Sequence, residues 1–196
     1  MINTWLGYNC DSSRRKVFPM DIREATIDDY DAIGLVTVTT SHSVFIGAIP
    51  EEDLDFSRTP EVSAANWRAG FSQNTDRGQH FLVAEEDHRV VGFVWCSPWA
   101  DTRGIDASVR GLYVYPTHQR RGVDKVLLKH GVTRLRDAGL RSLEIGCLKE
   151  NRSCGFYRHM GGVEIGRSQV RVDRYDTEEI LFGWRNLSTL GHLGFG

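Results

Sequence analysis

Cysteine and proline are scarce in this sequence, and the scarcity of cysteine argues against two kinds of site. The 196 residues contain four cysteines and five prolines. Cys10, Cys96, Cys147 and Cys154 show no C-x-x-C spacing and accompany no paired histidine motif. This pattern argues against a zinc site and against a disulfide framework. We therefore expect no bound metal, and a reducing cytoplasm is the expected location.

The chain also lacks a large net charge and a long apolar segment. The formal net charge is −2 and the isoelectric point is about 6.4, which gives the chain no general attraction to nucleic acid or to an anionic membrane. No apolar run approaches the length that spans a bilayer. We expect neither a nucleic-acid partner nor a membrane partner, so a local cluster of charge matters more than the total.

The length of the chain sets its domain organisation. A chain of 196 residues can bury one sizeable core and is too short for two ordinary domains. Residues 1–19 contain Arg14-Arg15-Lys16 without the apolar core of a secretory signal, so we expect a disordered N-terminal extension. One domain is predicted over residues 20–187, followed by a C-terminal tail over 188–196.

Hydrophobic periodicity alternates between strand and helix along the chain. The expected elements, in chain order, are a strand at 22–25, helices at 26–40 and 60–71, strands at 80–86, 89–97 and 108–115, a helix at 121–139, a strand at 141–148, a helix within 150–162, and a hairpin within 163–187. Residues 41–58 lack a clean period and are predicted to form a loop or a broken helix.

The segment LYVYPTHQRRGVDKVLL, residues 112–128, joins an apolar strand to an amphipathic helix through a basic turn that contains glycine. N–H groups in a first helical turn have no partner within the helix, and the aligned peptide dipoles place partial positive charge there. Arg120, Arg121 and Lys125 add formal charge beside that end. The segment therefore predicts an anion site suited to phosphate.

Two motifs resemble the GCN5-related N-acetyltransferase (GNAT) superfamily. The family's phosphate loop has the form Q/R-x-x-G-x-G/A after a strand, and Gln119 to Asp124 fit every position except the last. A later family helix carries a tyrosine in an FYxxxG-type segment, which Phe156-Tyr157 and Gly161 match. The order of elements also matches the family over about 21–187. The resemblance implies an α/β (α+β) fold with a mixed, mostly antiparallel central sheet, flanking helices and splayed central strands.

This resemblance implies an N-acetyltransferase that moves an acetyl group from acetyl-CoA to a primary amine by direct attack, without a covalent enzyme intermediate. Tyr157 would protonate the departing CoA thiolate. The oxyanion would meet the backbone of Leu112, Tyr113 and Val114. The diphosphate of acetyl-CoA would lie on the loop and first helical turn, formed by Gln119, Arg120, Arg121, Gly122, Val123, Asp124 and Lys125.

The chain departs from the family pattern at two cofactor positions. Asp124 replaces a Gly or Ala, and a carboxylate 4 Å from one phosphate charge would repel it by about 4 kcal/mol at an effective dielectric of 20. Its side chain either turns to solvent or is neutralised by a neighbouring cation, and as a first-turn carboxylate it also favours the helix dipole. Glu150 stands where the family usually has the Asn that contacts pantetheine, which leaves Asn151 as the candidate one residue nearer to Tyr157.

The general base and the amine acceptor remain open. Many family members carry a Glu on the central strand near Arg110, which this chain lacks, so the candidates are Glu144, His80, His118, Asp106 and a water molecule. The acceptor is expected to be a small-molecule or peptide amine, in a pocket that draws on Phe45, Trp67, Trp95, Trp99 and Tyr175. A homodimer is possible. The alternative function is a non-catalytic module that binds an acyl-CoA or a partner on the same fold, which Asp124 favours and Tyr157 opposes.

Overall fold

A computed structural model describes residues 20–46, 48–55, 58–72, 78–98 and 103–192. The N-terminal extension predicted over residues 1–19 lies outside these ranges, as does Trp99. All site residues named in the two family motifs lie within them.

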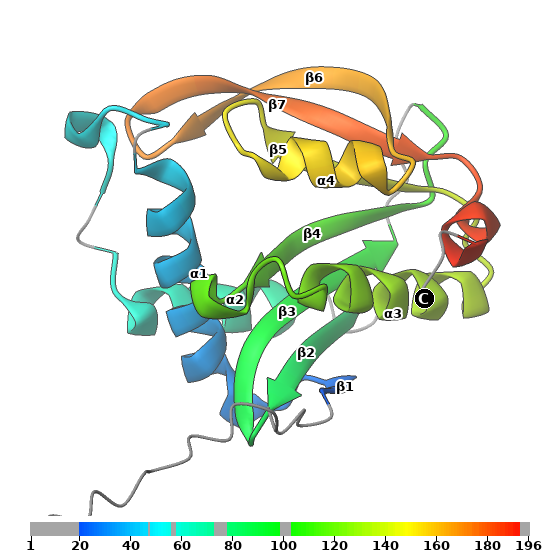
Figure 1. Cartoon of the computed structure of the whole chain (residues 1–196), viewed down its shortest axis with the longest axis horizontal. Coiled ribbons are helices and arrows are strands. Elements are labelled where there is room, and N and C mark those ends of the chain that lie inside the picture. Colours follow the sequence, from blue (N-terminus) through cyan, green and yellow to red (C-terminus); the bar gives the residue numbers. More distant parts are fainter. Residues whose placement is uncertain (1–19, 47, 56–57, 73–77, 99–102, 193–196) are drawn as a thin grey trace, which may run out of the picture.

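Seven strands form one mixed sheet in the order β1-β2-β3-β4-β5-β7-β6 (Figure 1). Among the described strands, β4 and β5 are the parallel pair, and every other neighbouring pair is antiparallel. The predicted mixed, mostly antiparallel sheet is therefore confirmed. The strands are β1 (Asp21–Glu24), β2 (His80–Glu86), β3 (Arg89–Pro98), β4 (Ala107–Val114), β5 (Leu143–Leu148), β6 (Val163–Val172) and β7 (Tyr175–Trp184).

Helices cover both faces of the sheet. Alternation along β2 shows the two faces, since Leu82 packs in the core beneath α3 and α4 whereas Phe81 and Val83 pack in the core beneath α1 and α2. Figure 1 shows α3 and α4 in front of the strands. The helices are α1 (Tyr30–Phe45), α2 (Pro60–Ser72), α3 (Val123–Asp137) and α4 (Ser153–His159).

Helix α1 runs five residues past its predicted end at Thr40 and takes in the start of the segment expected to be a loop. Its C-terminal half is rich in β-branched and hydroxyl residues, which have low helix propensity and hide the helical period. Tertiary contact compensates, because the Thr40 hydroxyl donates to the carbonyl oxygen of Val114 at 3.0 Å. This bond fixes α1 against the end of β4.

Both predicted hairpins are present. Asp87 and His88 connect β2 to β3 with φ values of 51° and 58°, as a two-residue type I′ turn requires. Asp173, with φ of 53°, begins the turn between β6 and β7. The C-terminal tail is predicted to begin at residue 188. That residue lies inside a short 3-10 helix, Leu187–His192, and Leu190 of this helix is buried in the core beside α3.

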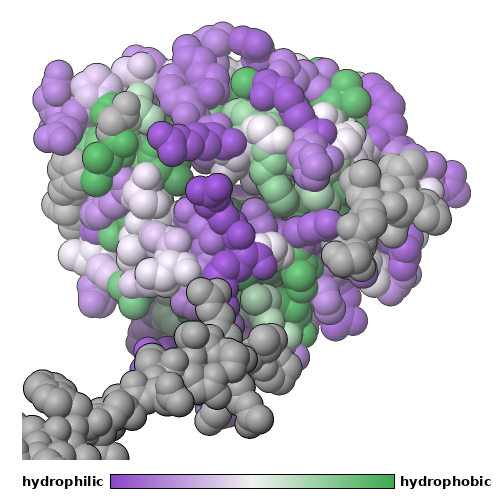
Figure 2. Space-filling model, in the orientation of Figure 1, coloured by the Kyte–Doolittle hydropathy of each residue, from purple (hydrophilic) through white to green (hydrophobic). Residues whose placement is uncertain are grey.

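The surface of the protein is largely polar. Figure 2 shows the face that carries α3 and α4 as mostly hydrophilic, with separate hydrophobic patches. Within the described part of the chain, no helix combines the length and the apolar character needed to cross a bilayer. The large hydrophobic side chains that are exposed come from different elements and are Ile27, Leu35, Ile46, Val62 and Val163.

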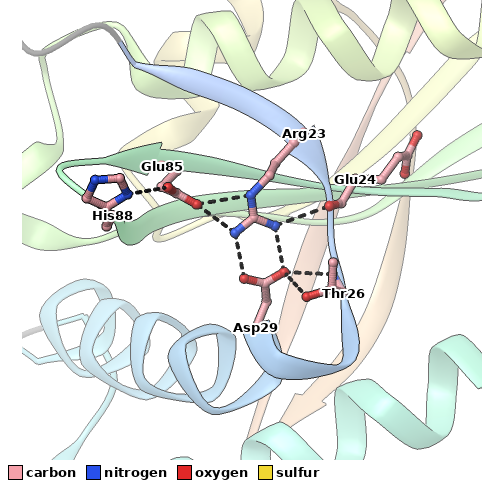
Figure 3. A network of polar contacts seen from close by, with 6 residues as sticks. All are labelled: Arg23, Glu24, Thr26, Asp29, Glu85 and His88. Carbon is pink, nitrogen blue, oxygen red and sulfur yellow. Dashed lines mark hydrogen bonds and ion pairs between the residues drawn. The ribbon is translucent and has the colours of Figure 1, made fainter.

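A buried carboxylate joins β1, β2 and the start of α1 (Figure 3). Arg23 donates two hydrogen bonds to the carboxylate of Asp29, at 2.7 and 2.8 Å. It also donates to the carboxylate of Glu85, at 2.6 Å. Asp29 is 6% exposed and also accepts the backbone N–H of Thr26 at 2.6 Å. The Arg23 hydrogen bonds hold the pKa of the Asp29 carboxyl below its ordinary value, against an opposing effect of burial.

Replacing Asp29 with Asn should lower the free energy of unfolding by about 1 to 3 kcal/mol at neutral pH, because Arg23 loses one of its two charged partners. The folded pKa of Asp29 lies below the unfolded value of about 3.9, so this stabilisation is present above that pH and is lost as pH falls through the folded pKa. In urea titrations from pH 7 to pH 3, the difference between the two proteins should therefore narrow once the pH falls below about 3.9. Asp31→Asn, an exposed first-turn carboxylate of α1, is the control and should cost less than about 1 kcal/mol. Equal losses in the two variants would contradict a special role for the pair.

Candidate functional site

Strands β4 and β5 pair over three residues and then separate. Their register ends at Val109↔Ile145, although β4 continues to Val114 and β5 continues to Leu148. Figure 1 shows the two strands diverging. The predicted splay of the central strands is confirmed, and we call the region between the unpaired halves of β4 and β5 the splay.

The backbone of β4 directs two N–H groups into the splay. Tyr115 donates its N–H to the carbonyl of Val91 on β3 at 2.8 Å. Because N–H directions alternate along a strand, Tyr113 also faces β3, whereas Leu112 and Val114 face the splay. Of the three residues expected to bind the acyl group, Leu112 and Val114 can therefore donate to an oxyanion, and the N–H of Tyr113 cannot.

The loop after β4 leads to helix α3 through two residues with left-handed backbone conformation. Arg120 has φ of 59° and Gly122 has φ of 83°. The first helical bond runs from the N–H of Val126 to the carbonyl of Gly122 at 3.0 Å, so the N–H groups of Val123, Asp124 and Lys125 precede the helical ladder. Gln119 fixes the loop to the splay, because its side-chain amide donates to the Val114 carbonyl at 3.0 Å.

The two loop arginines have different surroundings. Arg121 is paired with Glu86 at the end of β2, at 2.8 Å, and His118 contacts the other oxygen of that carboxylate at 3.0 Å. Arg120 is exposed. Glu86 therefore offsets the charge of Arg121, which leaves Arg120 as the better placed guanidinium for a phosphate.

Asp124 does not turn to solvent. Its carboxylate accepts the N–H of Lys125 at 2.8 Å, within the first turn of α3, and the residue is half-buried. This position lets the negative charge favour the helix dipole. The carboxylate therefore occupies the N–H of Lys125, which lies next to the N–H groups of Gln119 to Asp124 that the sequence assigns to the diphosphate.

Tyr157 lies in α4, on the same side of the sheet as α3. It is 6% exposed, and its ring packs against Phe182 at 5.7 Å and Trp184 at 6.5 Å between centroids. Burial raises the pKa of Tyr157 well above its ordinary value, and the negative charge of nearby Asp124 raises it further. The hydroxyl therefore stays protonated at neutral pH, which is the state that a proton donor needs.

The segment between β5 and α4 is ordered by its own side chains. Asn151, which precedes the N-cap residue Arg152, accepts the N–H of Ser153 at 2.8 Å, and Glu150 accepts the Thr177 hydroxyl at 2.8 Å. Asn151 also borders a small groove with Phe45 and Leu148. It lies beside β5, where a pantetheine contact requires it, but its side-chain oxygen is already used.

Two of the cysteines lie next to Tyr157. The Sγ atoms of Cys147 and Cys154 are 3.3 Å apart, and both residues are buried. Burial raises the pKa of the Cys147 thiol, which disfavours the thiolate that a nucleophile needs. The described residues contain no group of three or more His, Cys, Asp or Glu side chains that could hold a metal ion.

The aromatic residues expected in the acceptor pocket divide into two groups. Trp67 and Trp95 belong to the core beneath α1 and α2, where Trp67 donates to Thr37 and Trp95 donates to Gln79, each at 2.8 Å. Phe45 instead lines a shallow groove between α1 and the β6–β7 turn. The other lining residues of this groove are Val38, Ser41, His42, Leu54, Asp55, Arg58 and Asp173.

Each base candidate named from the sequence is held by a partner. Glu144 pairs with Arg103 at 2.6 Å, and His80 pairs with Glu24 at 3.0 Å. Asp106 accepts the N–H of Arg141 at 2.8 Å, and His118 contacts Glu86 as described above. Glu179 on β7 places a further carboxylate against the splay. No motif in the sequence marks this residue.

The sequence profile of the acetyltransferase (GNAT) family matches residues 46–161, which is more than half of the chain. Among curated proteins, L-amino acid N-acyltransferase MnaT of Escherichia coli (strain K12) is 31% identical over 93 residues, covering 47% of this chain and 54% of MnaT. The match thus spans about half of that relative. A ribosomal protein bS18-alanine N-acetyltransferase of Haemophilus influenzae is 25% identical over 120 residues, covering 58% of this chain and 79% of the relative.

A solved structure has the same fold. The crystal structure of PaiA N-acetyltransferase from Thermoplasma acidophilum in complex with coenzyme A superposes with a TM-score of 0.68 and 16% sequence identity, over 85% of this chain and 99% of that one. At 16% identity, the structural similarity to this enzyme shows that the two proteins have the same fold. The match to the family's sequence profile shows that the chain is related to the family. The chain belongs to the acetyltransferase (GNAT) family.

Proposed function

We propose that the protein is an N-acetyltransferase that moves an acetyl group from acetyl-CoA to a primary amine. One observation carries this proposal: the splay opens next to the loop that begins α3. Gln119 of this loop bonds the last carbonyl of β4 at 3.0 Å. A thioester held in the splay and a diphosphate held on the loop are two parts of one acetyl-CoA molecule, joined by its pantetheine arm.

The residues around the splay suit each step of a direct transfer. The amine nitrogen bonds to the thioester carbonyl carbon, and the N–H groups of Leu112 and Val114 stabilise the resulting oxyanion. The carbon–sulfur bond then breaks, and the CoA thiolate takes a proton from the Tyr157 hydroxyl. Arg120 and the N–H groups of Gly122 and Val123 hold the diphosphate.

The acceptor approaches from the side of the sheet that carries α1 and α2. The relatives support an amino group as the acceptor, since one is named for L-amino acids and the other for an alanine of a ribosomal protein. The groove that Phe45 lines also contains Arg58, paired with Asp173 at 2.9 Å. A small molecule or a peptide N-terminus that carries its own charge fits these surroundings.

Tyr157→Phe should lower kcat by about 100-fold or more, because the thiolate loses its proton donor. The dissociation constant of acetyl-CoA should stay within about twofold, since the ring contacts with Phe182 and Trp184 remain. Steady-state kinetics with a panel of amines and calorimetric titration of acetyl-CoA measure the two quantities. Tyr30→Phe, which removes the hydroxyl of another buried tyrosine at the start of α1, is the control. An unchanged kcat, or loss of folding, would show that Tyr157 is structural.

Asp124→Ala should tighten CoA binding by about tenfold, equivalent to about 1.4 kcal/mol, because the variant frees the N–H of Lys125 and removes a negative charge. Screening and partial exposure keep this gain below the unscreened repulsion. The expected gain should shrink in high salt. Asp137→Ala removes an exposed charge from the other end of α3 and should leave CoA affinity unchanged. Equal affinities for wild type and Asp124→Ala would mean that the carboxylate moves away when CoA binds.

A further inference from the structure

Glu179 of β7 places its carboxylate on the backbone of β5. The residue pairs with Leu148, two positions from Gly146 along β5. A Cβ atom built at Gly146 would overlap both side-chain oxygens of Glu179. Because glycine has no Cβ atom, it leaves room for the Glu179 carboxylate at this position.

The position of Gly146 puts this carboxylate at the start of the splay. Gly146 is the first residue of β5 beyond the last pair with β4, Val109↔Ile145. Its neighbours Ile145 and Cys147 point into the core beneath α3 and α4, so Gly146 and Glu179 face the opposite side, toward α1 and α2. Tyr157 lies on the α3 and α4 side of the sheet, and Glu179 lies on the side from which the proposed acceptor approaches.

The surroundings leave Glu179 with a weak partner. The Ser168 hydroxyl on β6 donates to it at 3.3 Å, and no Lys or Arg within the described residues forms an ion pair with it. Nearby cations are engaged elsewhere: Arg103 pairs with Glu144 on the same face of β5, whereas Lys149 and Arg167 both contact Glu178. Burial raises the pKa of Glu179 above its ordinary value.

We propose that Glu179 is the general base of the transfer and takes the proton from the acceptor's ammonium group. This inference rests on the proposed function. The ammonium loses one proton to Glu179, the neutral nitrogen bonds to the thioester carbon to give the oxyanion, and the carbon–sulfur bond then breaks. Tyr157 protonates the thiolate and regains its proton from the nitrogen through solvent, while Glu179 releases its proton to water. One ammonium ion and one thioester thus give one amide, one thiol and one proton.

The other carboxylates near the splay are poorer bases. Glu144 is bound to a guanidinium at 2.6 Å, which stabilises its ionised form and lowers its affinity for a proton. Glu150 accepts two contacts from the Thr177 hydroxyl and lies close to Lys149. Across the splay, the buried Tyr113 faces Glu179 and stays protonated because burial raises its pKa. The charge of Arg58 also acts on Tyr113, and Arg58 is paired with Asp173.

Glu179→Gln should lower kcat/KM by about 100-fold or more while leaving the dissociation constant of acetyl-CoA unchanged. The ionised fraction of Glu179 grows as pH rises through its folded pKa, so wild-type kcat/KM should show an acidic limb. With the same acceptor, the limb that belongs to Glu179 should be lost in the variant, which leaves the rise at higher pH that comes from deprotonation of the free amine. Glu178→Gln is the matched control, since Glu178 is the adjacent carboxylate on the other face of β7, and its kcat/KM should stay within about threefold of wild type.

The outcomes separate the two proposals. Wild-type turnover with an unchanged rate and pH profile in Glu179→Gln would overturn the role of Glu179 and leave the acetyltransferase function standing. A wild type that binds acetyl-CoA and acetylates no amine would overturn both. If Glu179→Gln fails to fold, Glu179→Asp decides: a folded variant with a wild-type rate and limb overturns the role, and a folded variant with a reduced rate and a displaced limb supports it.

Discussion

The end of backbone pairing between β4 and β5 is the constraint on which the rest of the structure depends. Each strand keeps a partner on its other side, β3 for β4 and β7 for β5, so the sheet stays continuous while its centre separates. The separation frees N–H groups that a closed sheet would consume in its ladder. Helices α3 and α4 then fill one side of the separation, and α1 covers the other.

In the proposed reaction, acid and base chemistry are divided between the two faces of one sheet. On one face, the Tyr157 hydroxyl is buried among aromatic rings and keeps its proton. On the other, the Glu179 carboxylate lies against a glycine and forms no ion pair with any residue that the structure describes. In the proposed reaction, protons leave the acceptor on one side of the sheet and reach the thiolate on the other, so neither group has to serve both steps.

Local motifs in the sequence predicted the parts of the site that local backbone geometry defines. The loop from Gln119 to Asp124 and the FY segment of α4 are short, and the order of elements follows from periodicity alone. Contacts between distant segments could not be predicted in the same way. Glu86 pairs with Arg121 across 35 residues, and Glu179 reaches Gly146 from the next strand of the sheet. The length of α1 was also missed, because a tertiary bond from Thr40 outweighs the low helix propensity of its sequence.

A single oxygen atom connects helix α1 with the loop before α3. The carbonyl of Val114 accepts one bond from Thr40 of α1, which borders the groove lined by Phe45, and one from Gln119 of the loop, each at 3.0 Å. In the proposed function these two segments bind the acceptor and the diphosphate. Any coupling through this oxygen would be reciprocal, so that each ligand would alter the affinity for the other by the same factor.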